Sequence, residues 1–133
     1  MEHRMEECAA ALGRAVPEID FTTNEPMSRH TTFAIGGPAD LFVTPKNAEE
    51  LTGALRVVRE RGLPLLLVGN GSNMLVSDAG FRGVVICTTS MDAVRVGDTG
   101  MVLAEAGALL GRVARRAQRA GLTGAEFAGG IPG

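Results

Sequence analysis

The stretch that decides the fold is LLLVGNGSNML, residues 65–75. Its first four residues are apolar and are bounded by a proline and a glycine, a pattern that predicts a short buried strand. The strand leads into a loop with two glycines, which let the main chain adopt positive φ and approach a ligand closely. Successive amide groups in such a loop form a concave site for an anion, and Ser72 and Asn73 add side-chain donors. We therefore interpret residues 69–73 as a loop that binds a phosphate or pyrophosphate.

Other phosphate loops have features that this loop lacks. A Rossmann fingerprint needs a helix that begins within the glycines, whereas residues 74–78 and 84–86 continue as extended chain, and no Walker lysine follows. A Gly-x-Gly-Ser sequence is also common in tight turns, and its place at the carboxyl end of a predicted parallel strand is what favours a ligand site. Ser72 lacks a neighbouring histidine and a Gly-x-Ser-x-Gly elbow, so we do not expect a nucleophile.

The composition limits the function further. The chain has 133 residues, 45% of them hydrophobic, and a net charge of −2, which gives no reason to expect nucleic acid or an acidic membrane as a partner. We expect no membrane span and no secretion signal, and therefore a cytoplasmic protein. Cys8 and Cys87 lie far apart with no histidine set nearby, which favours two reduced thiols and no metal site. The sequence stops in a glycine-rich turn, and we expect a fragment of a longer protein.

The N-terminal part predicts one helix and two extended segments. Residues 2–14 carry apolar side chains at helical spacing. Residues 18–32 are polar and are expected to form an irregular connection. Residues 31–35 are β-prone, and residues 39–44 predict a strand after a glycine turn.

The central part predicts a βαβ unit. Asn47 and Glu50 form a capping-box pattern, and the helix that follows ends at Gly62, before a strand over residues 63–68. Short links between strand, helix and strand favour two parallel strands. The face of this helix that we expect to be buried carries Leu51, Ala54, Leu55 and Val58.

The C-terminal part predicts a hairpin and a helix. Residues 93–96 and 101–106 read as two strands around a turn, and residues 108–120 as a helix. The four arginines of this helix could form a stripe that binds nucleic acid, but no aromatic residues are interleaved with them and the net charge is acidic, which favours a solvated face. Its expected buried stripe consists of Leu109, Leu110, Val113, Ala114 and Ala117.

Seven short motifs occur in a fixed order, and together they resemble the N-terminal part of the UDP-N-acetylenolpyruvoylglucosamine reductase family, also called UDP-N-acetylmuramate dehydrogenase. The resemblance covers about residue 25 to the end, and the ordered set is far more specific than any single motif. The motifs are TTFxIGGPAD (31–40), LP (63–64), GNGSN (69–73), FRGVVI (81–86), AG (106–107), GLxGxE (121–126) and GIPG (130–133).

The resemblance implies an α+β fold, the FAD-binding domain of the vanillyl-alcohol-oxidase or PCMH type, here as its first βαβ subdomain and the start of the second. It implies FAD as cofactor, NADPH as electron donor and UDP-N-acetylglucosamine enolpyruvate as substrate, in peptidoglycan synthesis. By the family's pattern the 69–73 loop holds the FAD pyrophosphate, and the 130–133 turn approaches the flavin and diphosphate. The cofactor-binding residues that the resemblance implies are Gly69, Asn70, Gly71, Ser72, Asn73, Gly107, Gly130, Ile131, Pro132 and Gly133.

The resemblance implies no catalytic residue in this chain. In the family a serine protonates the substrate carbon while an arginine and a glutamate stabilise the intermediate, and all three lie beyond the position that matches Gly133. The domain organisation we expect is an N-terminal helix and connection over residues 1–24 and a truncated FAD-binding domain over residues 25–133, with the substrate domain absent. Two alternatives stay open, a stand-alone module that binds a nucleotide or phosphate, and another flavin oxidoreductase of the same fold.

Overall fold

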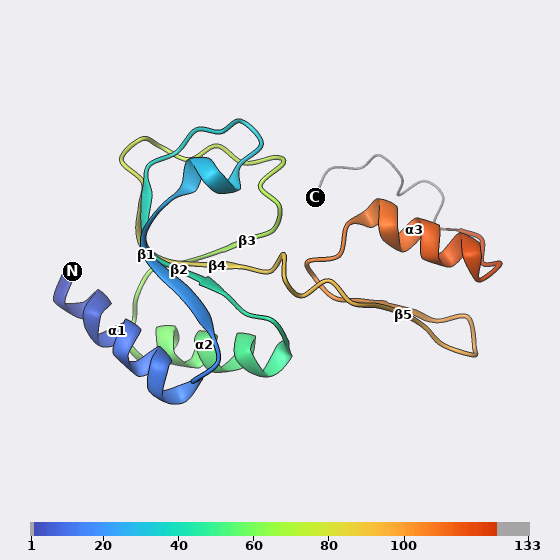
Figure 1. The fold of residues 1–133 in the computed structure, drawn as a ribbon, viewed down its shortest axis with the longest axis horizontal. Helices are drawn as coiled ribbons and strands as arrows, with labels where there is room; N and C mark the ends of the chain where they lie inside the picture. Colours follow the sequence, from blue (N-terminus) through green and yellow to red (C-terminus); the bar gives the residue numbers. More distant parts are fainter. Residues whose placement is uncertain (1, 125–133) are drawn as a thin grey trace.

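The protein is described here by a computed structural model of residues 2–124. These residues form a four-stranded sheet with two helices below it, and beside it a hairpin with a third helix (Figure 1). The elements are α1 (Glu2–Ala15), β1 (Asp20–Pro26), the 3-10 helix η1 (Met27–His30), β2 (Pro38–Thr44), α2 (Ala48–Glu60), β3 (Leu65–Val68), β4 (Phe81–Cys87), β5 (Val94–Val96), β6 (Val102–Ala104) and α3 (Leu110–Arg119).

The large sheet has the strand order β1-β2-β4-β3. Strand β1 is antiparallel to β2, whereas β2 and β3 both run parallel to β4. The predicted parallel orientation of β2 and β3 is therefore confirmed, but the two strands do not pair, because β4 lies between them. The carboxyl ends of β3 and β4 meet at one edge, where Val68 is in register with Cys87.

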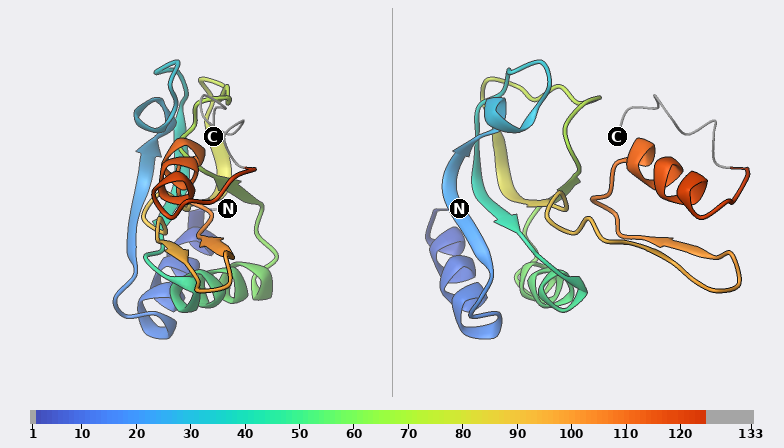
Figure 2. Two further views of the ribbon diagram at one scale, coloured as in Figure 1. Left: turned by 90° about the vertical axis from the view of Figure 1, so that its right-hand side faces the viewer. Right: turned by 45° about the vertical axis from the view of Figure 1, so that its right-hand side comes forward.

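The two faces of the sheet are covered in different ways. Helices α1 and α2 pack on one face, over residues such as Leu41 and Ile86, which are fully buried. The other face carries a smaller cluster that includes Phe42 and Val85, and the segment between β3 and β4 contributes Met74 and Val76 to it. This segment connects two parallel strands without a helix, and Figure 2 shows it arching back from the end of β3 to the start of β4.

Helix α2 begins as the capping pattern predicts. The N–H group of Glu50 donates a hydrogen bond to Asn47 Oδ1 at 2.8 Å, and Glu50 Oε1 accepts one from the N–H group of Lys46 at 2.8 Å. The reciprocal bond thus comes from the residue before the N-cap rather than from the N-cap itself. Ala54 and Val58 are buried as expected, with Val57 beside them, while Leu51 and Leu55 are partly buried.

Two predictions for the N-terminal part are wrong. The connection expected over residues 18–32 contains β1 and η1, because β1 pairs with β2 along six register positions despite its polar sequence. The segment expected to be extended, residues 31–35, is a turn in which Thr31 Oγ1 bonds the main chain of Ile35. Pairing across the sheet outweighs local propensity in β1, whereas bonds within the segment outweigh it at residues 31–35.

Residues 65–68 form a strand as predicted, but the strand is not buried as we expected. Strand β3 is the edge of the sheet, and Leu65 and Leu67 are 39% and 55% exposed. Val68 is buried, and Leu66 is partly buried against the cluster around Phe42. An apolar run alone does not distinguish an edge strand from a central one, because that depends on which strand inserts beside it.

The hairpin β5–β6 and helix α3 have the predicted order, but the helix is less buried than expected. Of its expected buried stripe only Ala117 is buried, while Leu109 and Leu110 are 50% and 38% exposed. Met101 and Leu103 of the hairpin are also exposed. Within residues 2–124, helix α3 packs mainly on the short hairpin, which leaves much of its apolar side uncovered. None of the helices within residues 2–124 is long and apolar enough to cross a bilayer.

Candidate functional site

The 69–73 loop is shaped by one of its two glycines. Gly71 has φ of +72°, and a Cβ atom there would lie 1.8 Å from the carbonyl oxygen of His30. The N–H group of Thr32 donates to the carbonyl oxygen of Gly71 at 3.1 Å. Any side chain at this position would collide with the main chain of the 30–32 segment, so glycine is required both for its backbone angle and for its size.

Gly69 differs from Gly71. Its φ lies outside the left-handed region, and a Cβ atom on it would meet no atom within 4 Å. The expectation that both glycines serve positive φ and close approach is therefore confirmed for Gly71 and wrong for Gly69 within this structure. Gly69 contributes its carbonyl oxygen, which accepts a hydrogen bond from the Cys87 thiol at 3.6 Å.

The loop contains one internal hydrogen bond and several donors that have no partner among the described main-chain groups. Asn70 Oδ1 accepts a hydrogen bond from the N–H group of Ser72 at 3.1 Å and so closes a local turn. Ser72 Oγ is buried and has no hydrogen-bond partner among the described residues. The main-chain N–H groups of Asn70, Gly71 and Asn73 donate to no main-chain carbonyl within residues 2–124. A buried hydroxyl without a partner is costly, and a bound acceptor would satisfy it.

A pocket of about 260 Å³ lies between this loop and the segment before β2. One wall consists of residues 29–32 and the other of Gly69 and Asn70, with Cys87 and Thr89 at the end of β4. The lining offers a guanidinium, an imidazole, hydroxyls, an amide and main-chain groups, and no carboxylate. Such a set of donors suits an anion that accepts several hydrogen bonds.

Gly107 joins the second half of the structure to this site. A Cβ atom there would lie 1.8 Å from the carbonyl oxygen of Thr88, and the N–H group of Gly107 donates to Met91 at 2.8 Å. The N–H group of Thr88 in turn donates to Val68 at 3.0 Å, directly before the loop. Gly107 thus contacts Thr88, which in turn is bonded to the residue before the loop. The amide of Gly107 itself already donates to the Met91 carbonyl.

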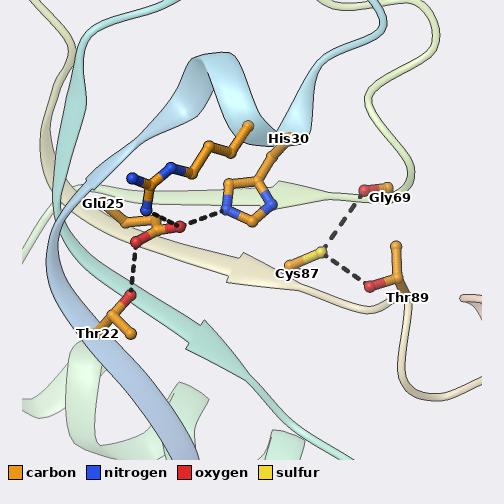
Figure 3. A network of polar contacts seen from close by, with 7 residues as sticks. Thr22, Glu25, His30, Gly69, Cys87 and Thr89 are labelled. Atoms are coloured by element: carbon orange, nitrogen blue, oxygen red, sulfur yellow. Dashed lines mark hydrogen bonds and ion pairs between the residues drawn. The ribbon is translucent and has the colours of Figure 1, made fainter. Parts of the chain in front are cut away.

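His30, a residue of the 29–32 wall, belongs to a cluster of polar contacts (Figure 3). The imidazole Nε2 lies 2.9 Å from Glu25 Oε1, and the ring stacks on Phe42 with centroids 4.0 Å apart. Glu25 also accepts a hydrogen bond from Thr22 at 3.3 Å and lies 3.7 Å from the Arg29 guanidinium. The bond from His30, more than the neighbouring charges, lowers the pKa of the Glu25 carboxyl.

Sequence reasoning missed this wall. It assigned no role to His30, whose side chain is 27% exposed and paired, or to Arg29, Thr32 and Thr89. Thr89 would have been found only by placing the extended segment at residues 84–86 as a parallel strand beside residues 65–68, since the carboxyl ends of neighbouring parallel strands meet at the same edge. The 29–32 wall reaches the site through the pairing of β1 with β2, which the sequence did not indicate.

The remaining predicted site residues divide into two groups. The structure brings together Gly69, Asn70, Gly71 and Ser72 with Asn73 exposed at the end of the loop, and it links Gly107 to them through Thr88. The predicted residues Gly130, Ile131, Pro132 and Gly133 lie outside the described residues. Both cysteines are free, as expected, and burial raises the pKa of the Cys8 thiol.

Comparisons with known proteins agree with this picture. The family described as "FAD binding domain" matches residues 39–133. The UDP-N-acetylenolpyruvoylglucosamine reductase of Heliobacterium modesticaldum is 54% identical over 108 residues, which are 81% of this chain and 34% of that protein. The protein of the same name from Clostridioides difficile is 44% identical over 115 residues, 86% of this chain and 38% of that protein. The chain thus spans little more than a third of the length of these relatives.

Solved structures show the same fold at low sequence identity. A variant of berberine bridge enzyme has a TM-score of 0.65 at 14% identity and covers 86% of this chain and 26% of its own. A glucooligosaccharide oxidase from Acremonium strictum has a TM-score of 0.61 at 19% identity, covering 86% of this chain and 25% of its own. The predicted α+β fold of the vanillyl-alcohol-oxidase or PCMH type is confirmed, and the chain belongs to the FAD binding domain family.

Proposed function

We propose that this chain is the FAD-binding portion of an NADPH-dependent reductase that converts UDP-N-acetylglucosamine enolpyruvate to UDP-N-acetylmuramate in peptidoglycan synthesis. The family match and the 44–54% identity to reductases of this name support the proposal. The observation that carries the site assignment is the buried Ser72 hydroxyl without a partner, in a loop whose close approach to His30 only glycine allows.

The residues present fit the pyrophosphate of FAD. The N–H groups of Asn70, Gly71 and Asn73 and the Ser72 hydroxyl would hold the phosphate oxygens, since charge-assisted bonds to an anion satisfy several donors at once. Arg29 lines the pocket that Gly69 and Asn70 of this loop also line, and it would add positive charge there. The absence of a carboxylate from the residues lining this pocket removes a source of repulsion.

The chain's contribution to the reaction is therefore binding and orientation. When bound, the flavin accepts a hydride from a reduced nicotinamide and passes it to an alkene. The loop would fix one end of the cofactor through its phosphates, and Gly107 would keep the second half of the domain against the turn that follows β4. We assign no catalytic residue to this chain. Gly130, Ile131, Pro132 and Gly133 stay proposed cofactor contacts, and a cytoplasmic location stays part of the proposal.

The test is a visible absorption spectrum of the polypeptide that the gene encodes, purified with FAD and then titrated anaerobically with NADPH. We expect flavin bands that NADPH bleaches and that UDP-N-acetylglucosamine enolpyruvate restores. Ser72→Ala should raise the dissociation constant for FAD about tenfold, a loss of about 1.4 kcal/mol, because the phosphate loses one buried donor. Ser90→Ala, in an exposed turn, is the matched control and should bind FAD as the wild type does.

Other outcomes would contradict the proposal. A polypeptide that binds no FAD but takes up ADP or another nucleotide would favour a stand-alone nucleotide-binding module. Flavin bands that NADPH bleaches but that the sugar nucleotide does not restore would favour another flavin oxidoreductase of this fold. Equal FAD affinity of Ser72→Ala and wild type would overturn the assignment of the loop.

A further inference from the structure

The cluster around His30 is a polar pair set into the apolar face of the sheet. His30 lies between Phe42, on which its ring stacks with an interplanar angle of 21°, and the Glu25 carboxylate, which is 2.9 Å from Nε2. The Glu25 side chain is only 15% exposed. Phe42 belongs to the buried cluster on this face. A half-buried ion pair adds little to stability compared with apolar packing, so its value is expected to lie in fixing a geometry.

The geometry that this cluster fixes is that of the main chain at residues 30–32. The His30 carbonyl oxygen occupies the space where Gly71 would carry a side chain, and the Thr32 amide bonds the Gly71 carbonyl at 3.1 Å. Thr31 stabilises the same turn through its bonds to Ile35. The position of Gly71 therefore depends on the position of the His30 main chain, which in turn depends on the anchored imidazole.

The Gly71 amide, which donates to no main-chain carbonyl within residues 2–124, is one of the donors assigned above to the phosphate. A displacement of the His30 main chain would move this donor and reshape the pocket, since His30 lines one wall of it and Gly69 and Asn70 line the other. Preorganised donors bind an anion more strongly than donors that must first be brought into place. A change at the imidazole thus reaches the phosphate site without a contact between His30 and the pyrophosphate being required.

We propose that His30 is a positioning residue for the phosphate loop, held by Glu25 and Phe42 and acting on the FAD pyrophosphate through Gly71. This inference rests on the proposed function, because it takes FAD as the ligand of the loop. The three groups that form this anchor come from β1, η1 and β2, which precede the loop in the chain.

The experiment compares FAD with riboflavin, which lacks both phosphates, as ligands of the full-length apoprotein. We expect His30→Ala to raise the dissociation constant for FAD about tenfold and that for riboflavin less than about twofold. His30→Gln should restore most of the FAD affinity, because its amide can donate to Glu25. His3→Ala is the matched control, since His3 lies on the exposed side of α1 and pairs only with Glu7, at 3.1 Å.

A purely structural role for His30 would weaken FAD and riboflavin binding equally, and this result would overturn the inference, as would wild-type FAD affinity in His30→Ala. A wild type that binds no FAD would instead overturn the proposed function, and the positioning role with it. Glu25→Gln keeps the size of the side chain, and it provides a second test of the anchor if His30→Ala fails to fold. It should raise the FAD dissociation constant about threefold with no change for riboflavin, and unchanged FAD affinity would count against the anchor.

Discussion

The two halves of the structure differ in how much core they contain. The sheet region, residues 2–91, has a buried cluster on each face of its four strands. The hairpin region, residues 94–119, has two paired strands of three residues each and one helix. Ala117 is the buried residue of that helix. Figures 1 and 2 show the hairpin region standing beside the sheet, joined to it through the segment after β4.

The difference indicates where the stability of the chain resides. Apolar side chains stabilise a fold in proportion to the surface that they remove from water. Met101 and Leu103 are 72% and 63% exposed, so they contribute little, whereas Leu41 and Ile86 are fully buried. The buried surface that stabilises the described residues therefore lies mainly in the sheet region, which also carries the 69–73 loop.

The largest expected effect compares the two cores. Ile86→Ala removes a fully buried side chain from the helix-covered face and should lower the free energy of unfolding by about 3 kcal/mol. Leu103→Ala, the matched truncation in the hairpin region, should change it by less than about 0.5 kcal/mol. Urea unfolding followed by circular dichroism measures both. Equal losses would show that the hairpin region is buried as well as the sheet region.

The second comparison lies within the loop. Gly71→Ala places a methyl group against the His30 carbonyl at a positive φ and should cost about 2 kcal/mol of stability, together with most of the FAD affinity. Gly69→Ala meets nothing and should fold as the wild type does. Thermal unfolding and FAD titration of the two variants provide the measurement. Wild-type behaviour of Gly71→Ala would show that the loop does not rest on the 30–32 segment.

The third comparison concerns how the helices of the two regions begin. Asn47→Ala removes the side-chain cap of α2 and should destabilise the protein by about 1 kcal/mol. Helix α3 has Leu109 at its N-cap with no side-chain bond, so Leu109→Asn should stabilise it slightly. Hydrogen exchange of the first-turn amides of each helix resolves the effects. Faster exchange in α3 of Leu109→Asn would contradict this account.

The smallest expected effect is a pH dependence in the sheet region. The pKa of Glu25 is lower in the folded chain than in the unfolded chain, so the unfolded chain binds more protons as the solution becomes acidic. The stabilisation from Glu25 is complete above its ordinary pKa and is lost as the pH falls toward the lowered value. We expect the difference in melting temperature between wild type and Glu25→Gln to shrink on acidification. A difference independent of pH would exclude this role of the carboxylate.

Local sequence patterns predicted much of the fold. Helices α1 and α2, the capping bond of Asn47, strands β2 and β4 and the β5–β6 hairpin occur where spacing and turn residues placed them. Local patterns failed in two places, where contacts between residues outweighed local propensity. The polar strand β1 exists because β2 offers it a partner, and residues 31–35 turn because Thr31 bonds Ile35 within its own segment.

The candidate site divides in the same way. The sequence by itself determined the 69–73 loop and the membership of the chain in a flavoprotein family, because glycine spacing and ordered motifs are local properties of the chain. Only the tertiary structure decided that Gly71 and not Gly69 needs to be glycine, that β3 is an edge strand, and that His30, Glu25 and Phe42 anchor the opposite wall. These features depend on which residues distant in the chain come into van der Waals contact, and no local pattern contains that information.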